Sequence, residues 1–335
     1  MNVAVDAMGG DNAPEVVVQG ALKAAAEAGV DITLVGDQKR LEKLLESYSS
    51  SSMDHVSVHH CDQVVLMNES PLRAIREKKS ASIRVAFDLV KTGRAEAVVS
   101  AGHSGAALAA GVIGLGRMKG ITRPALAGLF PGEQGDVLLI DVGANVDCRP
   151  AHLFQFGVMA HAFARTCMGV REPKIGLLSI GTEGGKGNEQ VRQTRELFEE
   201  SHLAFAGNVE GREIFTGALE VIVCDGFVGN VALKLSEGMA ESVTGLLKKE
   251  LWGTWPGRAA LLLGRGTLDK FLGRLDYEEY GGVPLLGIKG IGIICHGGSS
   301  PKAIKNGIKL AVKYVRNDFL EKMGLELEEQ GIAAD

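Results

Sequence analysis

The stretch KIGLLSIGTEGGKGNEQV (residues 174–191) joins an apolar run, a glycine-rich turn and a helical pattern. The apolar run 175–180 is typical of a strand buried on both faces. Residues 189–200 predict a helix with Asn188 as its N-cap. Four glycines and Lys186 lie between them, and backbone N–H groups, a helix N-terminus and a lysine all favour anions. We therefore predict an oxyanion site, with a plain strand-to-helix turn as the alternative. The turn matches neither a P-loop nor Gly-x-Gly-x-x-Gly, so nucleotide binding stays open.

The composition sets outer limits on structure and function. The chain has 335 residues, 45% of them hydrophobic and 23% charged, which is enough for one large α/β unit or two domains. The net charge of -5 argues against a general nucleic-acid binder. Five scattered cysteines without a Cys-x-x-Cys pair suit a reducing cytosol and predict no metal site. We also expect neither a signal peptide nor a membrane span.

A strand, a polar glycine turn and a helix follow one another at least six times along the chain. The strand patterns lie at 3–5, 32–35, 56–60, 97–100, 137–142, 175–180, 204–209, 220–224 and 291–295. This alternation predicts an α/β fold, with a mostly parallel sheet layered by helices. We expect one large domain over residues 1–320, interrupted by a hairpin at 248–276 and followed by an acidic tail at 321–335.

Polar residues gather at the carboxyl ends of the predicted strands, the edge where open α/β sheets bind ligands. After the first strand, Asp6 and Asp11 bracket Gly9 and Gly10. Capping and turn chemistry is the alternative reading for each aspartate.

A second glycine turn follows the strand pattern 97–100 and presents His103 and Ser104 before a helix. Since no Asp or Glu lies beside them in the sequence, a Ser–His nucleophile is not supported. His55, His59 and His60 also lie close together, but strand alternation separates neighbouring side chains, so a metal site is disfavoured there.

Several of these turns resemble sequence blocks of the bacterial phosphate acyltransferases. The blocks are DAMGGDNAP (6–14), SAGHSGA (100–106), DVGAN (141–145), GTEGGKG (181–187), GNVEG (207–211), CDGFVGN (224–230) and HG (296–297). They occur in the expected order, and the similarity runs from residue 2 to about residue 315.

The resemblance implies an enzyme that forms acyl phosphate from acyl-acyl-carrier-protein and inorganic phosphate at the start of phospholipid synthesis. It implies a fold similar to phosphotransacetylases and isopropylmalate dehydrogenases, and a cytosolic homodimer associated with the inner face of the membrane. It implies no metal, nucleotide or other cofactor. The product would pass to a downstream membrane acyltransferase.

On these grounds we assign site residues in two groups. The expected catalytic residues are Lys186, Asn188, Asp225, Asn230 and His296. The expected substrate-binding residues are Asp6, Gly9, Gly10, Asp11, His103, Ser104, Asn145, Thr182, Gly184, Gly185, Asn208, Glu210 and Ser299.

This chemistry explains why no protein nucleophile is evident. Inorganic phosphate can itself attack the thioester, and a thiol of pKa about 8.5 leaves readily as thiolate. The protein must then position phosphate against the carbonyl and stabilise the oxyanion that forms. A decarboxylating dehydrogenase, a short-chain phosphotransacetylase using CoA and a non-catalytic membrane scaffold remain alternatives. Trapping acyl phosphate with hydroxylamine separates them.

The segment 248–276 breaks the strand–helix rhythm. It holds both tryptophans, Trp252 and Trp255, together with Leu261 and Leu262, and arginines and lysines alternate with these apolar residues. This composition predicts two short helical pieces that dock on a membrane surface; a dimerisation arm or a core hairpin is the alternative.

Two basic clusters are candidates for contact with the acidic carrier protein. The first is a stripe along the last predicted helix, 302–320, and the second is the cluster 73–79. A solvated helix face is the alternative in both cases. The stripe consists of Lys302, Lys305, Lys309, Lys313 and Arg316.

Overall fold

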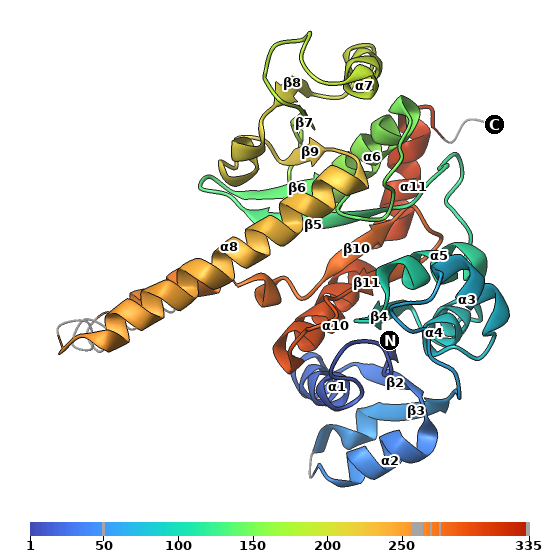
Figure 1. The fold of residues 1–335 in the computed structure, drawn as a ribbon. Helices are drawn as coiled ribbons and strands as arrows, with labels where there is room; N and C mark the ends of the chain where they lie inside the picture. The colour runs from blue at the N-terminus through green and yellow to red at the C-terminus, as the bar shows by residue number, and fades with distance from the viewer. Residues whose placement is uncertain (49–50, 256–263, 265, 269, 275, 333–335) are drawn as a thin grey trace.

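The computed structural model describes residues 1–48, 51–255, 264, 266–268, 270–274 and 276–332. These residues form a continuous 11-stranded sheet with the strand order β3-β2-β1-β4-β11-β10-β5-β6-β9-β7-β8. Apolar side chains pack into one core on each face of the sheet. One long helical arm leaves the body (Figure 1). The predicted mostly parallel α/β sheet is confirmed.

The sheet consists of two parallel halves that run in opposite directions. The first half contains β3 (Val56–His60), β2 (Asp31–Gly36), β1 (Asn2–Asp6), β4 (Ala97–Ser100) and β11 (Ile291–Ile294). The second half contains β6 (Asp136–Ile140), β9 (Val221–Val223), β7 (Ile175–Leu178) and β8 (Phe205–Val209). Two central strands join the halves by antiparallel pairing, β10 (Val283–Leu286) and β5 (Ala125–Pro131).

The helices of the described chain cover both faces of this sheet. They are α1 (Glu15–Ala28), α2 (Gln38–Glu46), α3 (Pro71–Glu77), α4 (Ser82–Lys91), α5 (Ser104–Gly114), α6 (Pro150–Phe163), α7 (Glu189–Glu199), α8 (Gly226–Gly253), α10 (Pro301–Arg316) and α11 (Phe319–Glu329). Short helical turns occur at η1 (Ser51–His55), η2 (Ala164–Met168), η3 (Gly211–Phe215) and η4 (Tyr277–Glu279).

The central strands β5 and β10 are the elements that the sequence pattern missed. β5 reads ALAGLFP and β10 reads VPLL, so each contains a proline, and β5 also contains a glycine. Both residue types weaken a strand signal. The prediction for β7 was too long, since the strand ends at Leu178 and the Ile180 side chain is 83% exposed.

The predicted last helix and acidic tail are corrected. A break at Asn317 and Asp318 separates α10 from α11, and Asp318 adopts a left-handed backbone with φ 52°. Phe319, Met323 and Leu327 of α11 are buried, so most of the supposed tail is a packed helix. Their spacing of four residues places them on one face, a signal that the surrounding charges obscured.

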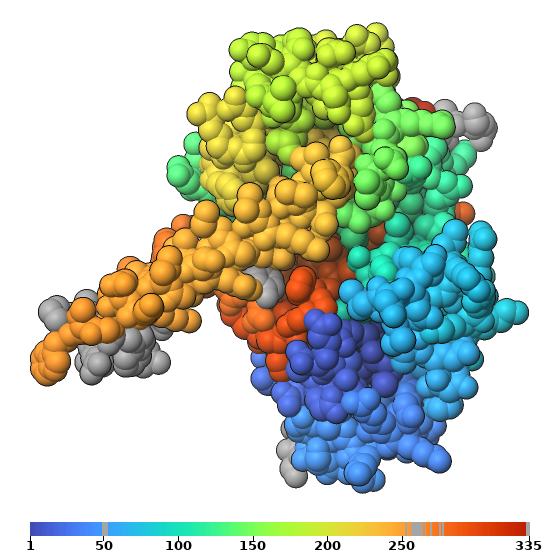
Figure 2. Space-filling model, in the orientation of Figure 1, coloured from blue at the N-terminus to red at the C-terminus, as the bar shows by residue number. Residues whose placement is uncertain are grey.

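The arm begins with α8, which runs unbroken for 28 residues to Gly253 and so continues into the start of the segment 248–276 (Figures 1 and 2). The returning leg is helical at residues 264, 266–268 and 270–274. Trp255 near the far end is 83% exposed. The Trp252 side chain, Leu261 and Leu262 lie outside the described residues. Among the described helices, none is long and apolar enough to span a bilayer.

Candidate active site

A pocket of about 320 Å³ lies where the two halves of the sheet meet. The central strands contribute Gly128 and Val283, and other walls include Ser104 at the start of α5, Asn230 and Lys234 in the first turns of α8, and Ala303 at the start of α10. Helix N-termini carry partial positive charge, and Lys234 adds a full positive charge to the lining. The pocket therefore suits an anionic ligand. Four predicted site residues line it, namely Ser104, Asn230, His296 and Ser299.

The wall from the first half is organised by a buried carboxyl group. Asp6, 2% exposed, accepts a hydrogen bond from Ser100 Oγ at 2.7 Å, and Ser100 Oγ in turn accepts one from Gly102 N–H at 3.0 Å. Burial raises the pKa of Asp6, against the opposing effect of its hydrogen bonds. Gly9 packs here so closely that a Cβ would lie 2.5 Å from Asp6 Oδ2 and 2.8 Å from Gly102 Cα. These contacts bind the turns after β1 and β4 together.

The turn after β11 joins the same wall. Asp11 N–H donates to the carbonyl oxygen of Gly297 at 2.8 Å. Gly10 is left-handed, with φ 112°, which allows this approach without strain. His296 Nδ1 accepts from Gly298 N–H at 3.1 Å, and Ser299 is buried behind it. Asp6, Gly9, Gly10 and Asp11 thus shape the pocket from behind.

The opposite wall repeats this design with Asp141, which is fully buried. Its Oδ1 accepts from the N–H groups of Leu126, Gly143 and Ala144 at 3.0, 3.2 and 3.0 Å. Its Oδ2 accepts from Asn145 N–H at 2.6 Å and from Asn145 Nδ2 at 2.9 Å. Burial raises the pKa of Asp141, and these hydrogen bonds oppose that rise. Asn145 therefore supports the turn and does not itself line the pocket.

The start of α8 brings polar side chains to the pocket. Asp225 is its N-cap and accepts from Phe227 N–H at 3.0 Å and from Val228 N–H at 2.9 Å. One turn apart along the helix, Asn230 and Lys234 both line the pocket, followed by Glu237. Burial raises the pKa of the Glu237 carboxyl, and nearby His296 opposes that rise.

The pocket offers no activated thiol. Cys295 lines it, but burial raises the pKa of this thiol to about 12. Because the thiolate is the reactive form, Cys295 is protonated and inert near neutral pH.

His103 is the N-cap of α5, and its Nδ1 accepts from Gly105 N–H at 3.1 Å. Among the described residues, no group of three His, Cys, Asp or Glu side chains could hold a metal ion.

The remaining predicted residues lie on the turn after β7 and at the carboxyl end of β8, outside the pocket lining. Lys186 is exposed, and Asn188 caps α7 by accepting from Val191 N–H at 2.9 Å. Asn208 Nδ2 donates to the carbonyl oxygens of Glu183 and Lys186 at 3.1 and 3.4 Å. This group comprises Thr182, Gly184, Gly185, Lys186, Asn188, Asn208 and Glu210.

This loop shares a sheet edge with one pocket wall. β6, β9 and β7 run parallel, so the turn after β7 lies two strands from the turn after β6, about 10 Å at normal strand spacing. Two buried atoms beside the loop, Ser179 Oγ and Asn208 Oδ1, have no hydrogen-bond partner among the described residues. Because its turn lies on the same sheet edge as a pocket wall and beside these two atoms, Lys186 remains a predicted site residue.

Comparison with known proteins assigns the family. A family described as "Fatty acid synthesis protein" matches residues 1–322. The chain is 52% identical over 332 residues to the phosphate acyltransferase of Pelobacter propionicus, covering 99% of this chain and 96% of that protein. It is 54% identical over 329 residues to the phosphate acyltransferase of Citrifermentans bemidjiense, covering 98% and 93%.

The chain belongs to the phosphate acyltransferase family.

Solved structures show how the phosphate acyltransferase fold relates to others. A phosphotransacetylase from Streptococcus pyogenes superimposes with a TM-score of 0.62 at 19% identity, covering 98% of this chain and 94% of that one. The EutD phosphotransacetylase from Staphylococcus aureus gives 0.58 at 16% identity, covering 93% and 94%. The expected likeness to phosphotransacetylase folds is confirmed, and the chain is a transferase.

Among the pocket residues that were missed from sequence are its lysine, Lys234, and its carboxylate, Glu237. Their spacing could have indicated them. Lys234 follows Asn230 by four residues and Glu237 follows Lys234 by three, so all three side chains lie on one face of a helix. The glycine block at 224–230 drew attention to the turn and away from the helix behind it.

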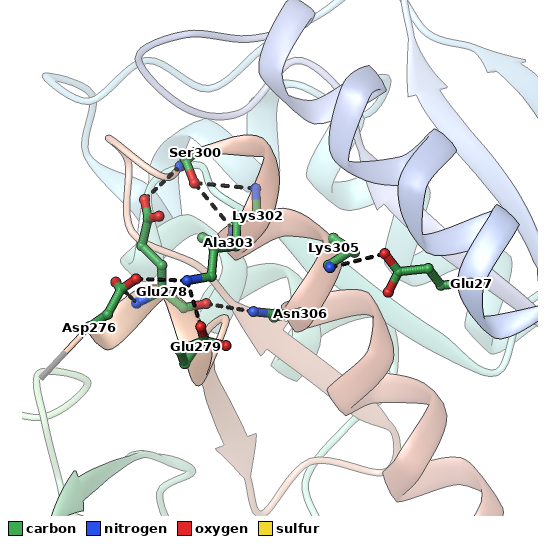
Figure 3. Close-up of polar contacts among 9 residues, drawn as sticks. All are labelled: Glu27, Asp276, Glu278, Glu279, Ser300, Lys302, Ala303, Lys305 and Asn306. Carbon is green, nitrogen blue, oxygen red and sulfur yellow. Dashed lines mark hydrogen bonds and ion pairs between the residues drawn. The ribbon is translucent and has the colours of Figure 1, made fainter. Parts of the chain in front are cut away.

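The basic stripe on α10 is largely neutralised. Lys302 Nζ lies 2.8 Å from Asp276 Oδ2 and 2.6 Å from Glu279 Oε1 (Figure 3). Lys305 and Lys309 each lie 3.1 Å from the carboxylate of Glu27. The same region of Figure 3 shows Asn306 Nδ2 donating to the Glu278 carbonyl at 2.9 Å. The contacts of Lys302 and Asn306 fasten residues 276–279 at the base of the arm to α10, and those of Lys305 and Lys309 join α10 to α1. The stripe is therefore a weaker candidate for binding a carrier protein.

Proposed function

We propose that this phosphate acyltransferase transfers the acyl group of acyl-acyl-carrier-protein to inorganic phosphate, releasing acyl phosphate for phospholipid synthesis. The observation that carries the proposal is the pocket where α5, α8 and α10 begin beside Lys234 and His296. A phosphate that carries two negative charges is stabilised by a cation and by the positive ends of helix dipoles.

The reaction needs few protein groups. A phosphate oxygen attacks the thioester carbonyl, forming a C–O bond, and the C–S bond breaks as the carrier thiolate leaves. Lys234 and the helix N-termini hold phosphate, and N–H groups of the glycine turns stabilise the oxyanion. Asn230 and His296 donate to phosphate or to the carbonyl. Asp6, Asp141 and Asp225 act indirectly by holding the turns that carry these donors.

Lys186 is proposed as a second cation that contacts the substrate from the turn after β7. The thioester arm of a carrier protein is long, so it extends beyond the pocket toward this edge. The other predicted residues of this region hold the turn that carries Lys186 or lie beside it. They are Thr182, Gly184, Gly185, Asn188, Asn208 and Glu210.

The decisive experiment combines purified enzyme, acyl-acyl-carrier-protein and phosphate, and traps the product with hydroxylamine. We expect acyl hydroxamate that depends on all three components. Acyl-CoA in place of the carrier tests the short-chain phosphotransacetylase alternative. No hydroxamate from either donor contradicts the proposal.

For the carrier protein we propose the cluster on α3. Pro71 packs against the start of α5, where a Cβ on Gly105 would lie 2.9 Å from Pro71 Cγ, so α3 borders the pocket. Arg73 and Lys78 are paired with Glu77 and Glu69 at 2.8 and 2.6 Å. Arg76 and Lys79 form no ion pair with the described residues.

Charge reversal tests this docking surface. Arg76→Glu with Lys79→Glu should raise KM for the carrier severalfold at low salt and leave KM for phosphate unchanged. Arg316→Glu on α10 is the matched control. An unchanged KM for the carrier would remove α3 from the interface.

We further propose that the arm docks a homodimeric enzyme on the inner face of the cell membrane, where the product meets the next acyltransferase. Exposed apolar residues run along α8, including Val228, Val231 and Leu246, and suit contact with a second copy. Trp255 suits the bilayer surface, where a buried apolar side chain contributes roughly 1.5–3 kcal/mol.

Leu261→Glu with Leu262→Glu should abolish co-sedimentation with anionic vesicles and spare turnover of soluble substrate. If the variant becomes monomeric and inactive instead, the segment serves dimerisation and not membrane binding. Wild-type sedimentation of the variant would exclude residues 261 and 262 as the membrane contact.

A further inference from the structure

A second, apolar groove of about 370 Å³ lies beside the active-site pocket. Phe130 of β5 and Phe215 of η3 form one side, with ring centroids 6.1 Å apart in an edge-to-face arrangement. One face of α8 forms the other side, through Ser236, Ala240 and Val243. The spacing of three and four residues keeps these side chains in line along the helix.

The groove is continuous with the pocket. Leu129, Leu233, Glu237 and Tyr280 line both spaces. From Leu233 at the junction to Val243, the groove follows ten residues of α8, or about 15 Å of helix. It thus leads away from the polar pocket along the arm and provides apolar walls for an extended ligand.

We propose that this groove binds the acyl chain of the thioester substrate; this rests on the proposed function. With the carbonyl beside Lys234 and His296, the carrier arm and the acyl chain must leave the pocket by different routes. The groove is the apolar route that begins inside the pocket. The hydrogen-bond donors proposed to hold phosphate lie in the pocket, and the acyl chain lies in the groove. Leu233 and Glu237 mark the boundary between the two spaces.

A second copy of the chain is a less suitable occupant. The groove is concave and walled by Phe130 and Phe215, and Leu235, Met239 and Val243 of α8 line it, whereas Val228, Val231 and Leu246 lie beyond the two ends of that wall. Those three residues remain available for packing against a second copy. The groove therefore measures chain length, and residues farther along α8 should contact carbons farther from the carbonyl.

The test measures kcat/KM for butanoyl-, octanoyl- and hexadecanoyl-carrier protein in the hydroxylamine assay. Ser236→Phe fills the groove near the junction, and Ser242→Phe, an exposed position outside the groove, is the matched control. Each methylene excluded from an apolar site costs roughly fourfold in binding. We expect Ser236→Phe to lower the hexadecanoyl-to-butanoyl ratio at least tenfold and Ser242→Phe to change it less than about twofold.

Val243→Trp tests whether the distant carbons of a long acyl chain reach the far, partly exposed end of the groove. It should lower the hexadecanoyl-to-butanoyl ratio but not the octanoyl-to-butanoyl ratio, and it provides a second variant if Ser236→Phe does not fold. If wild-type enzyme forms acyl phosphate and both groove variants, Ser236→Phe and Val243→Trp, keep its chain-length profile, the groove does not bind the chain. Variants that change only the oligomeric state assign the groove to a second copy. Failure of wild-type enzyme with every carrier overturns the proposed function and this inference together.

Discussion

Two glycine turns of this molecule look alike in sequence and differ in their surroundings. The turn after β1 is enclosed, because Gly9 packs on Gly102 and Asp11 bonds to Gly297. The turn after β7 is open, and Gly185 has no atom within 4 Å of where a Cβ would be. Both follow a strand and precede a helix.

The difference comes from the position of each strand in the sheet. β1, β4 and β11 face the start of α8 across β10 and β5, where the two halves of the sheet meet. The turn after β7 belongs to the outer part of the second half, and the pocket lining does not reach it. Glycine composition therefore signals a turn, and the meeting of the two halves makes the pocket.

The largest expected effect compares one lysine from each region. Lys234→Ala should lower kcat/KM by about 10²-fold or more, the usual cost of losing one electrostatic donor. We expect a similar loss for Lys186→Ala if the substrate spans both regions. Steady-state kinetics with the carrier substrate measures both variants, and Lys249→Ala on the exposed part of α8 is the control.

Either lysine whose loss leaves kcat/KM within about threefold of wild type does not belong to the site. A large effect at Lys234 alone would confine the site to the pocket. A large effect at Lys186 alone would overturn the pocket as the place where phosphate binds.

A glycine pair gives the next largest effect. Gly9→Ala should destabilise the fold by roughly 1–3 kcal/mol, because its Cβ would meet Asp6 and the Gly102 backbone. Gly185→Ala enters open space, and its free energy of unfolding should change by less than about 0.5 kcal/mol. Urea denaturation measures both, and equal stabilities would refute the contrast between enclosed and open turns.

The smallest expected effect concerns the helix caps. Asp225→Ala and Asn188→Ala each remove a side-chain acceptor at a helix start, so each should cost about 1 kcal/mol of stability. Replacement by serine, which also caps, should restore that stability. A loss of kcat/KM that serine does not rescue would give either residue a role in the reaction beyond capping.

The sequence was most informative where local signals and tertiary context agree. Asn188 was read as an N-cap and is one, because capping depends on neighbouring residues alone. β5 and β10 were missed because their pairing is long-range and antiparallel while Gly128, Pro131 and Pro284 weaken their local signal. Periodicity cannot report that two halves of a sheet run in opposite directions.

The same limit applies to the site. Ser104, Asn230, His296 and Ser299 were predicted, and the structure brings them together around one pocket. Lys234 was overlooked, since a lysine in mid-helix resembles any solvated side chain. The stripe on α10 shows the reverse error, because sequence spacing cannot reveal that Glu27, Asp276 and Glu279 neutralise three of its lysines.

The placement of β11 has a consequence for how the protein is synthesised. β11 lies between β4 and β10, and α10 packs on α1 so closely that a Cβ on Gly20 would lie 2.5 Å from Ile304 Cβ. While a ribosome is still translating the middle of the chain, the β4 edge and the apolar face of α1 have no partner. Unpaired strand edges of this kind are prone to aggregation. The nascent chain must therefore protect its first third until roughly the last tenth has emerged from the exit tunnel.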